Sequence, residues 1–170
     1  MTISAERLRE ILLYDPGTGL FTWRKTMGRN VAGSTAGTLR SDGYIRIQIE
    51  GERKYAAHWA WLYMTGKLPD DEVDHEDRNR SNNAWSNLRP ATKSQNCANR
   101  VVLRGDLPRG VGRRGKKFVA MIRVRGETRY LGIHDTPEQA HEAYLKEAVA
   151  AFGSYSFEAA NDNGQVRAVA

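Results

Sequence analysis

The sequence predicts an α+β fold in two small parts. Residues 44–50 and 117–125 alternate apolar and polar side chains, which is typical of strands with one buried face. Thr92 and Thr136 each open a helix, the first with a capping box and the second with a proline followed by an acid. A chain of 170 residues suffices for one ordinary domain or two small ones. We divide it after residue 100, because a linker follows and the pattern of residues changes beyond it.

The first part contains helices and hairpins in turn. Apolar Leu8, Ile11 and Leu12 predict a short helix over residues 4–13. A turn, a strand, a loop or irregular hairpin, a second hairpin and a buried helix follow, at residues 15–19, 20–24, 26–42, 44–56 and 57–65. An acidic segment, an asparagine-rich loop and a helix complete the part, at residues 68–77, 78–85 and 92–100.

The second part is expected to be a small sheet covered by one helix. A linker is predicted at residues 101–109, because glycine and proline interrupt any periodic pattern there. The part itself spans residues 110–157, and residues 158–170 are expected to be a disordered tail. It contains a strand whose apolar side is formed by Phe118, Ala120, Ile122 and Val124, a returning strand at 129–134, and a helix from Thr136 to Gly153.

The charge distribution points to a nucleic acid and to a cation. The net charge is +6 and the sequence pI is about 9.6, which alone is weak evidence. Residues 100–130 hold ten Lys or Arg and two acids, so this stretch suits phosphates. Residues 70–77 hold six acids, and such a cluster in a basic chain suggests a place where a cation sits.

Composition also predicts what the chain lacks. Cys97 is the only cysteine, so we expect no internal disulfide and no structural zinc, and we interpret Cys97 as a small buried residue. No run of about 18 apolar residues predicts a membrane span, and residues 1–10 do not resemble a secretory signal. The expectation is a cytoplasmic protein without membrane association.

Four residues suit the hydrolysis of a phosphodiester: Asp74, His75, Asn87 and Asn96. A histidine can take the proton of attacking water near neutral pH, because its ordinary pKa is about 6.5. A carboxylate and an amide oxygen can hold a hard cation such as Mg²⁺. Neighbouring residues of a strand point to opposite sides, so Asp74 can hold the metal while His75 faces water. Taken singly, an Asp-His pair is more often incidental, and the two asparagines would be turn or cap residues.

Two stretches around these residues resemble the HNH endonuclease family, in particular phage and intron homing endonucleases. They are residues 73–89 (VDHEDRNRSNNAWSNLR) and residues 91–96 (ATKSQN), and the upstream segments GYIRI and HWAW extend the resemblance to about residues 12–100. It implies a ββα-metal fold with a core motif at 73–100. The family usually has glycine where Arg78 stands, so the turn after the histidine is a departure from the pattern.

The same resemblance implies a role for each of the four residues. His75 would be the general base, Asp74 and Asn96 ligands of Mg²⁺ or Mn²⁺, and Asn87 the residue that holds the hairpin in shape. An asparagine in the last position makes this an H-N-N variant. The resemblance also implies that the protein is encoded by a bacterial host or a phage.

The basic end resembles the Apetala-type DNA-binding domain of plant ethylene-response factors. The segments that carry this likeness are GVGRR, KFVAMIRV, RYLG and DTPEQAHEAY, beginning at Gly110, Lys117, Arg129 and Asp135. The resemblance implies three antiparallel strands on one helix, with the sheet in the major groove of DNA. The residues expected to contact DNA are Arg100, Arg113, Arg114, Lys117, Arg123, Arg125 and Tyr130. Alternatively, the arginines form a solvated face that only blocks edge pairing.

Together these observations predict a metal-dependent homing-type endonuclease that acts on double-stranded DNA. No small-molecule cofactor is expected, and the protein would be a monomer or a weak dimer. The main alternative is a DNA-binding regulator whose nuclease half is a degenerate scaffold. A structured-RNA binder is a third hypothesis. The target sequence, and nicking against double-strand cleavage, are not specified by the residues.

Overall fold

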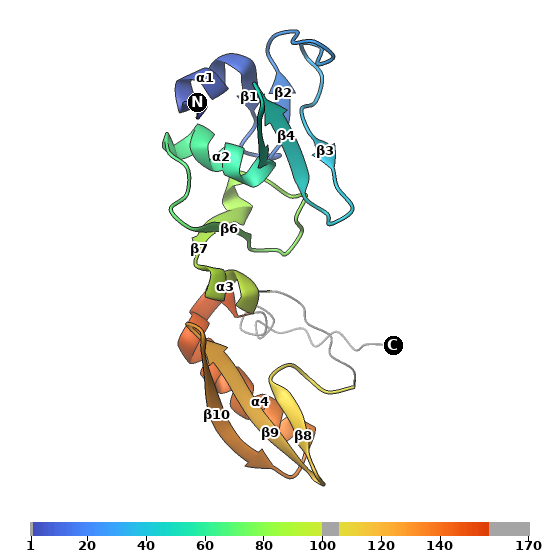
Figure 1. The fold of residues 1–170 in the computed structure, drawn as a ribbon, viewed down its shortest axis with the longest axis vertical. Helices are drawn as coiled ribbons and strands as arrows, with labels where there is room; N and C mark the ends of the chain where they lie inside the picture. The colour runs from blue at the N-terminus through green and yellow to red at the C-terminus, as the bar shows by residue number, and fades with distance from the viewer. Residues whose placement is uncertain (1, 100–105, 157–170) are drawn as a thin grey trace. The chain divides into compact units, whose positions relative to one another are not determined.

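The computed structural model describes residues 2–99 and 106–156, and its fold is mixed α+β (Figure 1). Its internal contacts divide the chain into two compact units, Met1–Ala91 and Thr92–Ala170, which we call the N-terminal and C-terminal units. Each unit has its own cluster of buried apolar side chains. Two small cores therefore stand in place of the single core that a chain of this length could form.

A short helix and two strands open the N-terminal unit: α1 (Ala5–Ile11), β1 (Leu12–Tyr14) and β2 (Phe21–Trp23). The Ser4 side chain caps α1 by accepting a hydrogen bond from the backbone of its first turn. The predicted helix was wrong at Leu12 and Leu13, which belong to β1. The reason is tertiary, because Leu12 and Tyr14 both become buried when β1 pairs with β2.

A three-stranded antiparallel sheet follows, in the order β3 (Thr38–Leu39), β4 (Ile45–Ile49) and β5 (Glu52–Tyr55). Glu50 and Gly51 close the β4–β5 hairpin with φ values of 47° and 88°, the left-handed pair of a tight two-residue turn. The helix α2 (Ala56–Thr65) starts directly after β5 and ends at Gly66, as the sequence predicts to within one residue.

One apolar core joins these helices and sheets. Its largest fully buried side chains include Leu8 of α1, Phe21 of β2, Ile47 of β4 and Trp59 of α2. The Trp59 indole N–H donates to the backbone oxygen of Ile47 at 3.2 Å, so its polar atom is satisfied inside the core. Four elements are thus anchored before the chain reaches the predicted site.

A second hairpin carries the candidate site. It consists of β6 (Glu72–His75) and β7 (Leu88–Ala91), with a short 3-10 turn, η1 (Trp85–Asn87), leading into β7. Val73 and Leu88 join the core, so the hairpin is fixed on one side. The segment 76–84 connects the strands as a long loop.

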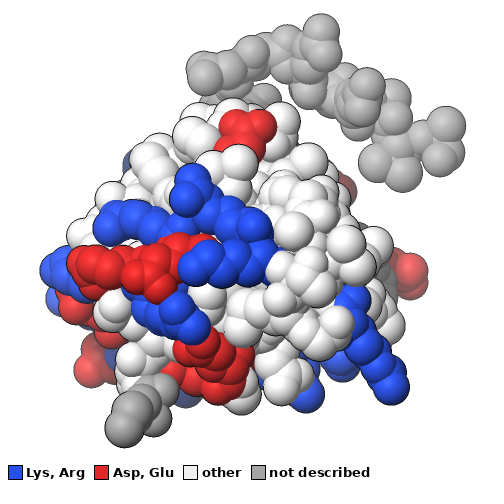
Figure 2. Space-filling model, turned by 90° about the horizontal axis from the view of Figure 1, so that it is seen from above, with Lys and Arg blue, Asp and Glu red and all other residues white. Residues whose placement is uncertain are grey.

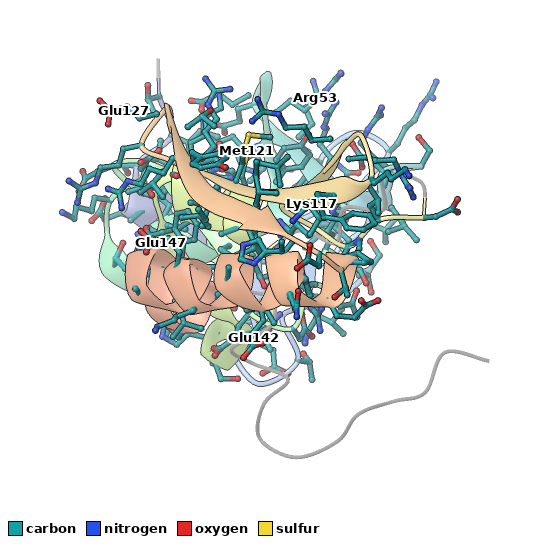
Figure 3. The ribbon with its side chains drawn as sticks, turned by 90° about the horizontal axis from the view of Figure 1, so that it is seen from below. Arg53, Lys117, Met121, Glu127, Glu142 and Glu147 are labelled. Carbon is teal, nitrogen blue, oxygen red and sulfur yellow. The ribbon has the colours of Figure 1, made fainter. Side chains whose placement is uncertain are left out.

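The C-terminal unit contains a short helix, a three-stranded sheet and a long helix. They are α3 (Lys93–Ala98), β8 (Val111–Arg114), β9 (Lys117–Val124), β10 (Glu127–His134), α4 (Pro137–Phe152) and a 3-10 turn, η2 (Gly153–Tyr155). The sheet is antiparallel in the order β10-β9-β8, and α4 lies along one face of it (Figure 3). Ile122 and Val124 of β9 pack with Tyr144 and Ala148 of α4.

A glycine allows α4 to lie close to the start of β8. A Cβ atom on Gly110 would stand 2.0 Å from the Tyr144 ring, and Gly110 has φ 77°, so no other residue fits there without a shift. The Thr136 side chain caps α4, and Pro137 is its first residue, as the sequence predicts.

The boundary between the units differs from the sequence-based division. It falls after Ala91, because α3 belongs with the C-terminal cluster through buried Ala98. Arg109 strengthens this attachment by donating to the backbone oxygens of Cys97 and Ala98, each at 2.8 Å. Cys97 itself is exposed, so its interpretation as a buried residue was wrong.

Arg125 departs from its predicted position, and several other predicted residues lie outside the described part of the chain. Arg125 was predicted on the strand, but it lies in the β9–β10 turn, where φ is 49° and Gly126 follows with 88°. Arg100, most of the linker and the tail at 158–170 lie outside the described residues. In the parts of the chain that are described, no helix is long and apolar enough to cross a membrane.

Charges in the N-terminal unit are mixed rather than uniformly basic. Arg7 of α1 pairs with Glu10 and with Glu50, and Lys54 pairs with Glu52. Figure 2 shows a face on which Lys and Arg side chains alternate with Asp and Glu. A positive site in this unit must therefore be found from particular arginines, not from overall charge.

Candidate functional site

The β6–β7 hairpin places Asp74 and His75 next to each other on one strand. Their side chains point to opposite sides of β6, and they pair in register with Arg89 and Leu88 of β7. Both are buried, with exposed fractions of 3% and 4%. Burying two ionisable groups is costly unless each has partners, so the partners define what the site is built to do.

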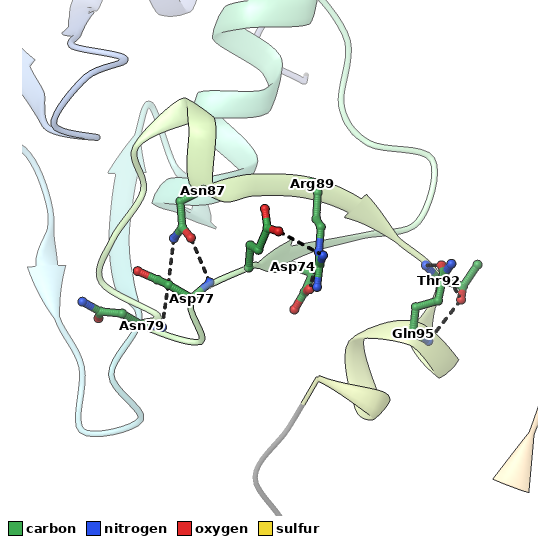
Figure 4. Close-up of polar contacts among 8 residues, drawn as sticks. Asp74, Asp77, Asn79, Asn87, Arg89, Thr92 and Gln95 are labelled. Carbon is green, nitrogen blue, oxygen red and sulfur yellow. Dashed lines mark hydrogen bonds and ion pairs between the residues drawn. The ribbon is translucent and has the colours of Figure 1, made fainter. Parts of the chain in front are cut away.

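The partner of Asp74 is an arginine on the opposite strand. Arg89 Nε donates to Asp74 Oδ2 at 2.9 Å, and the same guanidinium lies 3.6 Å from a carboxylate oxygen of the exposed Glu76 (Figure 4). The Arg89 side chain is itself mostly buried. The hairpin therefore holds one carboxylate in a fixed position beside a cation.

The partner of His75 is Asn83, from the loop between the two strands. His75 Nε2 lies 3.1 Å from Asn83 Oδ1, and an amide oxygen can only accept, so the ring donates from Nε2. Asn83 Nδ2 donates to the Ser81 backbone oxygen at 3.0 Å, which fixes the orientation of the amide. In the neutral ring, Nδ1 is then the nitrogen with the lone pair.

Asn83 is itself held by two residues from the start of the N-terminal unit, Tyr14 and Gly19. It is 1% exposed, and its backbone oxygen accepts a hydrogen bond from the Tyr14 hydroxyl at 2.7 Å. Gly19 packs so closely that a Cβ there would lie 2.2 Å from the Asn83 carbonyl carbon. Sequence reasoning missed Asn83, because the loop also offers Asn79 and Asn82 and only burial separates the three.

Asn87 binds the loop that leaves His75. Its Oδ1 accepts from the Asp77 backbone N–H at 2.9 Å, and its Nδ2 donates to Asp77 Oδ1 at 2.9 Å and to the Asn82 backbone oxygen at 2.8 Å (Figure 4). The turn after His75 is completed by Arg78, which has φ 66°. Arginine thus adopts the left-handed conformation that glycine adopts more easily, at a cost of about 1–2 kcal/mol.

Burial sets the electrostatics of the two histidines in this unit. It is the main cause that lowers the pKa of His75 below its ordinary value, although the hydrogen bond to Asn83 opposes it. Burial lowers the pKa of His58 in the same way. A lowered pKa keeps His75 neutral at pH 7, which is the form that can accept a proton.

The residues offer hard oxygen donors for a metal ion. Asp74 supplies a carboxylate, and Mg²⁺ needs only one or two carboxylates because waters and phosphate oxygens complete its shell. Asn96 lies half-buried on α3, which belongs to the C-terminal unit, whereas Asp74 belongs to the N-terminal unit. Within residues 2–99 and 106–156, no three His, Cys, Asp or Glu side chains gather as a ligand set. The donor chemistry fits a site with one protein carboxylate.

The register of the C-terminal sheet separates the residues predicted to contact DNA. Arg114 pairs with Lys117, Met121 pairs with Tyr130, and Arg123 pairs with Thr128, so these residues occupy the face away from α4, which we call the outer face. Figure 3 shows Met121 on that side. Tyr130 is 58% exposed.

Two of the predicted residues have other surroundings. Arg113 pairs with Phe118, whose side of the sheet is the helix side, and its guanidinium lies 5.1 Å from the centre of the Phe118 ring. Lys117 is exposed but pairs with Asp135 at 2.8 Å, and this partner raises the pKa of the lysine. Arg113 therefore does not share a face with Arg114.

Comparison with known proteins links the hairpin region to one family. The HNH endonuclease family model matches residues 54–98, a segment that includes Asp74, His75, Asn87 and Asn96. An uncharacterized HNH endonuclease of Acanthamoeba polyphaga mimivirus is 35% identical over 97 residues, which are 56% of this chain and 51% of that protein. The chain thus spans about half the length of this curated relative.

A solved structure described as DNA binding and cleavage by the HNH homing endonuclease I-HmuI is also similar. It is 27% identical, covers 51% of this chain and 49% of its own, and has a TM-score of 0.39, which is too low to define a shared fold. The two sequence matches, to the family and to the viral protein, support an HNH endonuclease domain in this chain.

Proposed function

We propose that this protein is a metal-dependent DNA endonuclease of the homing type, with His75 as general base and Asp74 as metal ligand. The observation that carries the proposal is the pair of buried neighbours on β6, one fixed to Arg89 and the other to Asn83. The pair lies inside the segment that matches the HNH endonuclease family.

His75 performs the proton transfer. A water molecule attacks phosphorus and loses a proton to His75 Nδ1, whose lone pair is defined by the Nε2 hydrogen bond to Asn83. The bond from phosphorus to the 3′ oxygen breaks, the leaving oxygen takes up a proton from solvent water, and the products are a 5′-phosphate and a 3′-hydroxyl. Asn87 keeps the loop after His75 in shape, so it positions the base without touching the substrate.

Asp74 and Asn96 would hold Mg²⁺ or Mn²⁺. When bound, the metal supplies stabilisation of the charge that develops on the phosphate and the leaving oxygen. The Arg89 guanidinium offsets part of the cost of burying the Asp74 carboxylate, so the ligand stays ordered. We assign Asn96 as the second metal ligand because it occupies the last position of the HNH-like motif.

The outer face of the C-terminal sheet would deliver the DNA. Arg114, Arg123 and Tyr130 are exposed there, and arginine can bind phosphates or read guanine edges with two hydrogen bonds. Lys117 would join them by exchanging Asp135 for a phosphate. Arg125 would contact the backbone from the hairpin turn, and Arg100, which lies outside the described residues, would be a further contact.

A plasmid-nicking assay tests the function. The intact protein is expected to cut supercoiled plasmid with Mg²⁺ or Mn²⁺ and to stop when EDTA is added, and His75→Ala is expected to bind the plasmid without cutting it. Metal-dependent cutting by His75→Ala would overturn the assigned base. Tight DNA binding by the intact protein, with no cleavage in either metal, would instead indicate a non-catalytic DNA-binding regulator.

A further inference from the structure

Two arginines and two tyrosines form a layered cluster in the N-terminal unit. The rings of Tyr44 and Tyr55 are 4.7 Å apart between centroids. The Arg80 guanidinium lies 5.0 Å from the centre of the Tyr44 ring, and the Arg46 guanidinium lies 5.2 Å from that of Tyr55. We call these four residues the arginine–tyrosine stack. Each cation rests at a distance typical of a cation–π contact.

The stack stands beside the proposed general base. The Tyr44 ring is 5.9 Å from the His75 ring, centre to centre. The stack residues come from three places in the chain: Tyr44 and Arg46 from the residue before β4 and from its second residue, Tyr55 from the end of β5, and Arg80 from the loop after β6. Folding therefore places Arg80 near His75 through the Tyr44 ring, and Arg46 lies one ring further away, on Tyr55.

Both arginines are held in place before any ligand binds. Arg80 Nη1 donates to the Asp42 backbone oxygen at 2.8 Å, and its aliphatic carbons lie next to Gly43, 3.7 Å from where a Cβ would stand. Arg46 Nη2 lies 3.4 Å from the Tyr55 hydroxyl. Among the residues that the structure describes, neither guanidinium forms a salt bridge with a carboxylate. Two ordered cations without a carboxylate partner make a site that favours an anion.

A groove extends the positive charge away from the stack. It has a volume of about 1010 Å³ and is lined by β3, β4, β5 and the loop before them, with Arg40, Arg46 and Arg53 along it. Glu50 is the acid that lines it, and Glu50 is paired with Arg7. A single phosphate would need only the two stacked cations, whereas a row of arginines along an open groove suits a chain of phosphates.

We propose that the arginine–tyrosine stack and this groove bind the sugar–phosphate backbone of the DNA strand on either side of the bond that is cut. Arg80 holds the phosphate next to His75, and Arg46, Arg40 and Arg53 hold the strand further along the groove. This inference rests on the proposed nuclease function. It assigns the strand-holding role to the N-terminal unit itself, separately from the outer face of the C-terminal sheet.

The test compares Arg46→Gln, Arg80→Gln and the double variant with Arg24→Gln, all in the full-length protein. Arg24 is exposed in the same unit and does not line the groove, so it controls for the loss of one charge. Binding of a fluorescent DNA duplex is measured in EDTA as salt is raised. Cleavage with Mg²⁺ is measured separately, and thermal unfolding checks that each variant is folded.

Each stack variant is expected to bind about tenfold more weakly, with a salt slope lower by about 0.9, as the loss of one phosphate contact predicts. Arg24→Gln should show neither change to this extent. Stack variants that bind and cut as Arg24→Gln does would overturn the proposal. If a variant unfolds, Arg80→Lys keeps the charge without the planar stacking, and an unchanged affinity and rate in that variant would count against the stack.

The two proposals fail in different ways. Binding is measured without metal, so a protein that never cuts but loses binding in the stack variants would refute the nuclease and support the strand-holding role. Unlabelled single-stranded and double-stranded RNA are added as competitors of the fluorescent DNA duplex, to test whether the bound sugar–phosphate backbone is that of DNA. Stronger competition by RNA than by DNA would overturn the assignment to DNA.

Discussion

The two units treat their polar residues in opposite ways. In the N-terminal unit, Asp74, His75, Asn83 and Asn87 are between 1% and 9% exposed, and their side chains hydrogen-bond to other parts of the hairpin. On the outer face of the C-terminal sheet, the residues predicted to bind DNA are exposed, and Tyr130 reaches 58%. One unit buries its polar groups among hydrogen-bond partners, and the other leaves them accessible.

The difference suits the functions that we propose for the two units. A proton transfer requires the base within hydrogen-bond reach of its water, so its orientation must be set in advance. Burial with satisfied partners achieves this, because each buried polar group left without one would cost about 1–3 kcal/mol. Phosphate binding by arginine tolerates movement, since the attraction is long-ranged and sequence-independent. Ordered polar networks therefore suit catalysis, and exposed arginines suit docking.

The largest expected effect is on cleavage by His75→Ala. We expect the rate at saturating DNA to fall about 10²–10⁴-fold, the range for a general base, while DNA affinity changes little because the buried neutral ring carries no charge. Single-turnover cleavage measures the rate, and DNA binding in the presence of EDTA measures the affinity, both on the same preparation. A loss of affinity as large as the loss of rate would contradict the division between the units.

A matched pair of glycine substitutions sharpens the same comparison. Gly19→Ala forces the Asn83 backbone to move, and Gly110→Ala forces the Tyr144 ring to move, and both positions have positive φ. We expect each to lower the free energy of unfolding by more than about 2 kcal/mol. Hydrogen exchange should rise in the N-terminal unit for Gly19→Ala and in the C-terminal unit for Gly110→Ala.

Each glycine substitution serves as the control for the other. Gly19→Ala is expected to impair cleavage more than binding, because it acts on the residue that orients His75. Exchange that rises in both units for either substitution would show that the units do not unfold separately.

On the C-terminal sheet, Arg123→Gln is expected to weaken DNA binding about tenfold and to leave the rate at saturating DNA unchanged. Arg113→Gln is the matched control, because the sheet register places Arg113 on the helix side with Phe118. Anisotropy titrations over a range of salt measure both. If Arg113→Gln weakens binding as much as Arg123→Gln, binding depends on net charge and not on the outer face.

Acid is expected to destabilise the N-terminal unit first. Burial lowers the pKa of His58 and of His75, so below pH 6.5 the unfolded chain takes up protons that the folded unit resists. The free energy of unfolding should therefore decrease as the pH falls from 7 toward 5. Denaturant titrations of the intact protein and of His58→Gln measure this, and the variant should lose part of the pH dependence. An equal dependence in both would remove His58 as a cause.

The smallest expected effect is a gain from Arg78→Gly. Arg78 has φ 66°, where glycine has no steric cost, so the substitution should raise the stability of the N-terminal unit by about 1 kcal/mol. Chemical denaturation measures it. Arg125→Gly, at φ 49° in the β9–β10 turn, is the counterpart in the other unit. A loss of stability in Arg78→Gly would mean that the arginine side chain contributes more than its backbone strain costs.

Local patterns predicted most of the secondary structure. The alternation along β9, the caps at Thr92 and Thr136, and the glycine that ends α2 are properties of a few neighbouring residues. The prediction failed at Leu12, which continues a helical pattern but pairs with β2 instead. The helix predicted at 92–100 is present as α3, Lys93–Ala98, and it belongs to the C-terminal unit and not to the first part.

The sequence by itself determined the α+β class, the capped helices, the Asp74-His75 pair and the basic C-terminal strands, because each depends on residue types at short spacing. Only the tertiary structure decided that Asn83 holds His75, that Arg89 pairs with Asp74, and that Arg80 stacks on Tyr44 beside the proposed base. These contacts join residues brought together by strand register and by burial. Neither has a signature in the spacing of residues, since both arise from the packing of the whole unit.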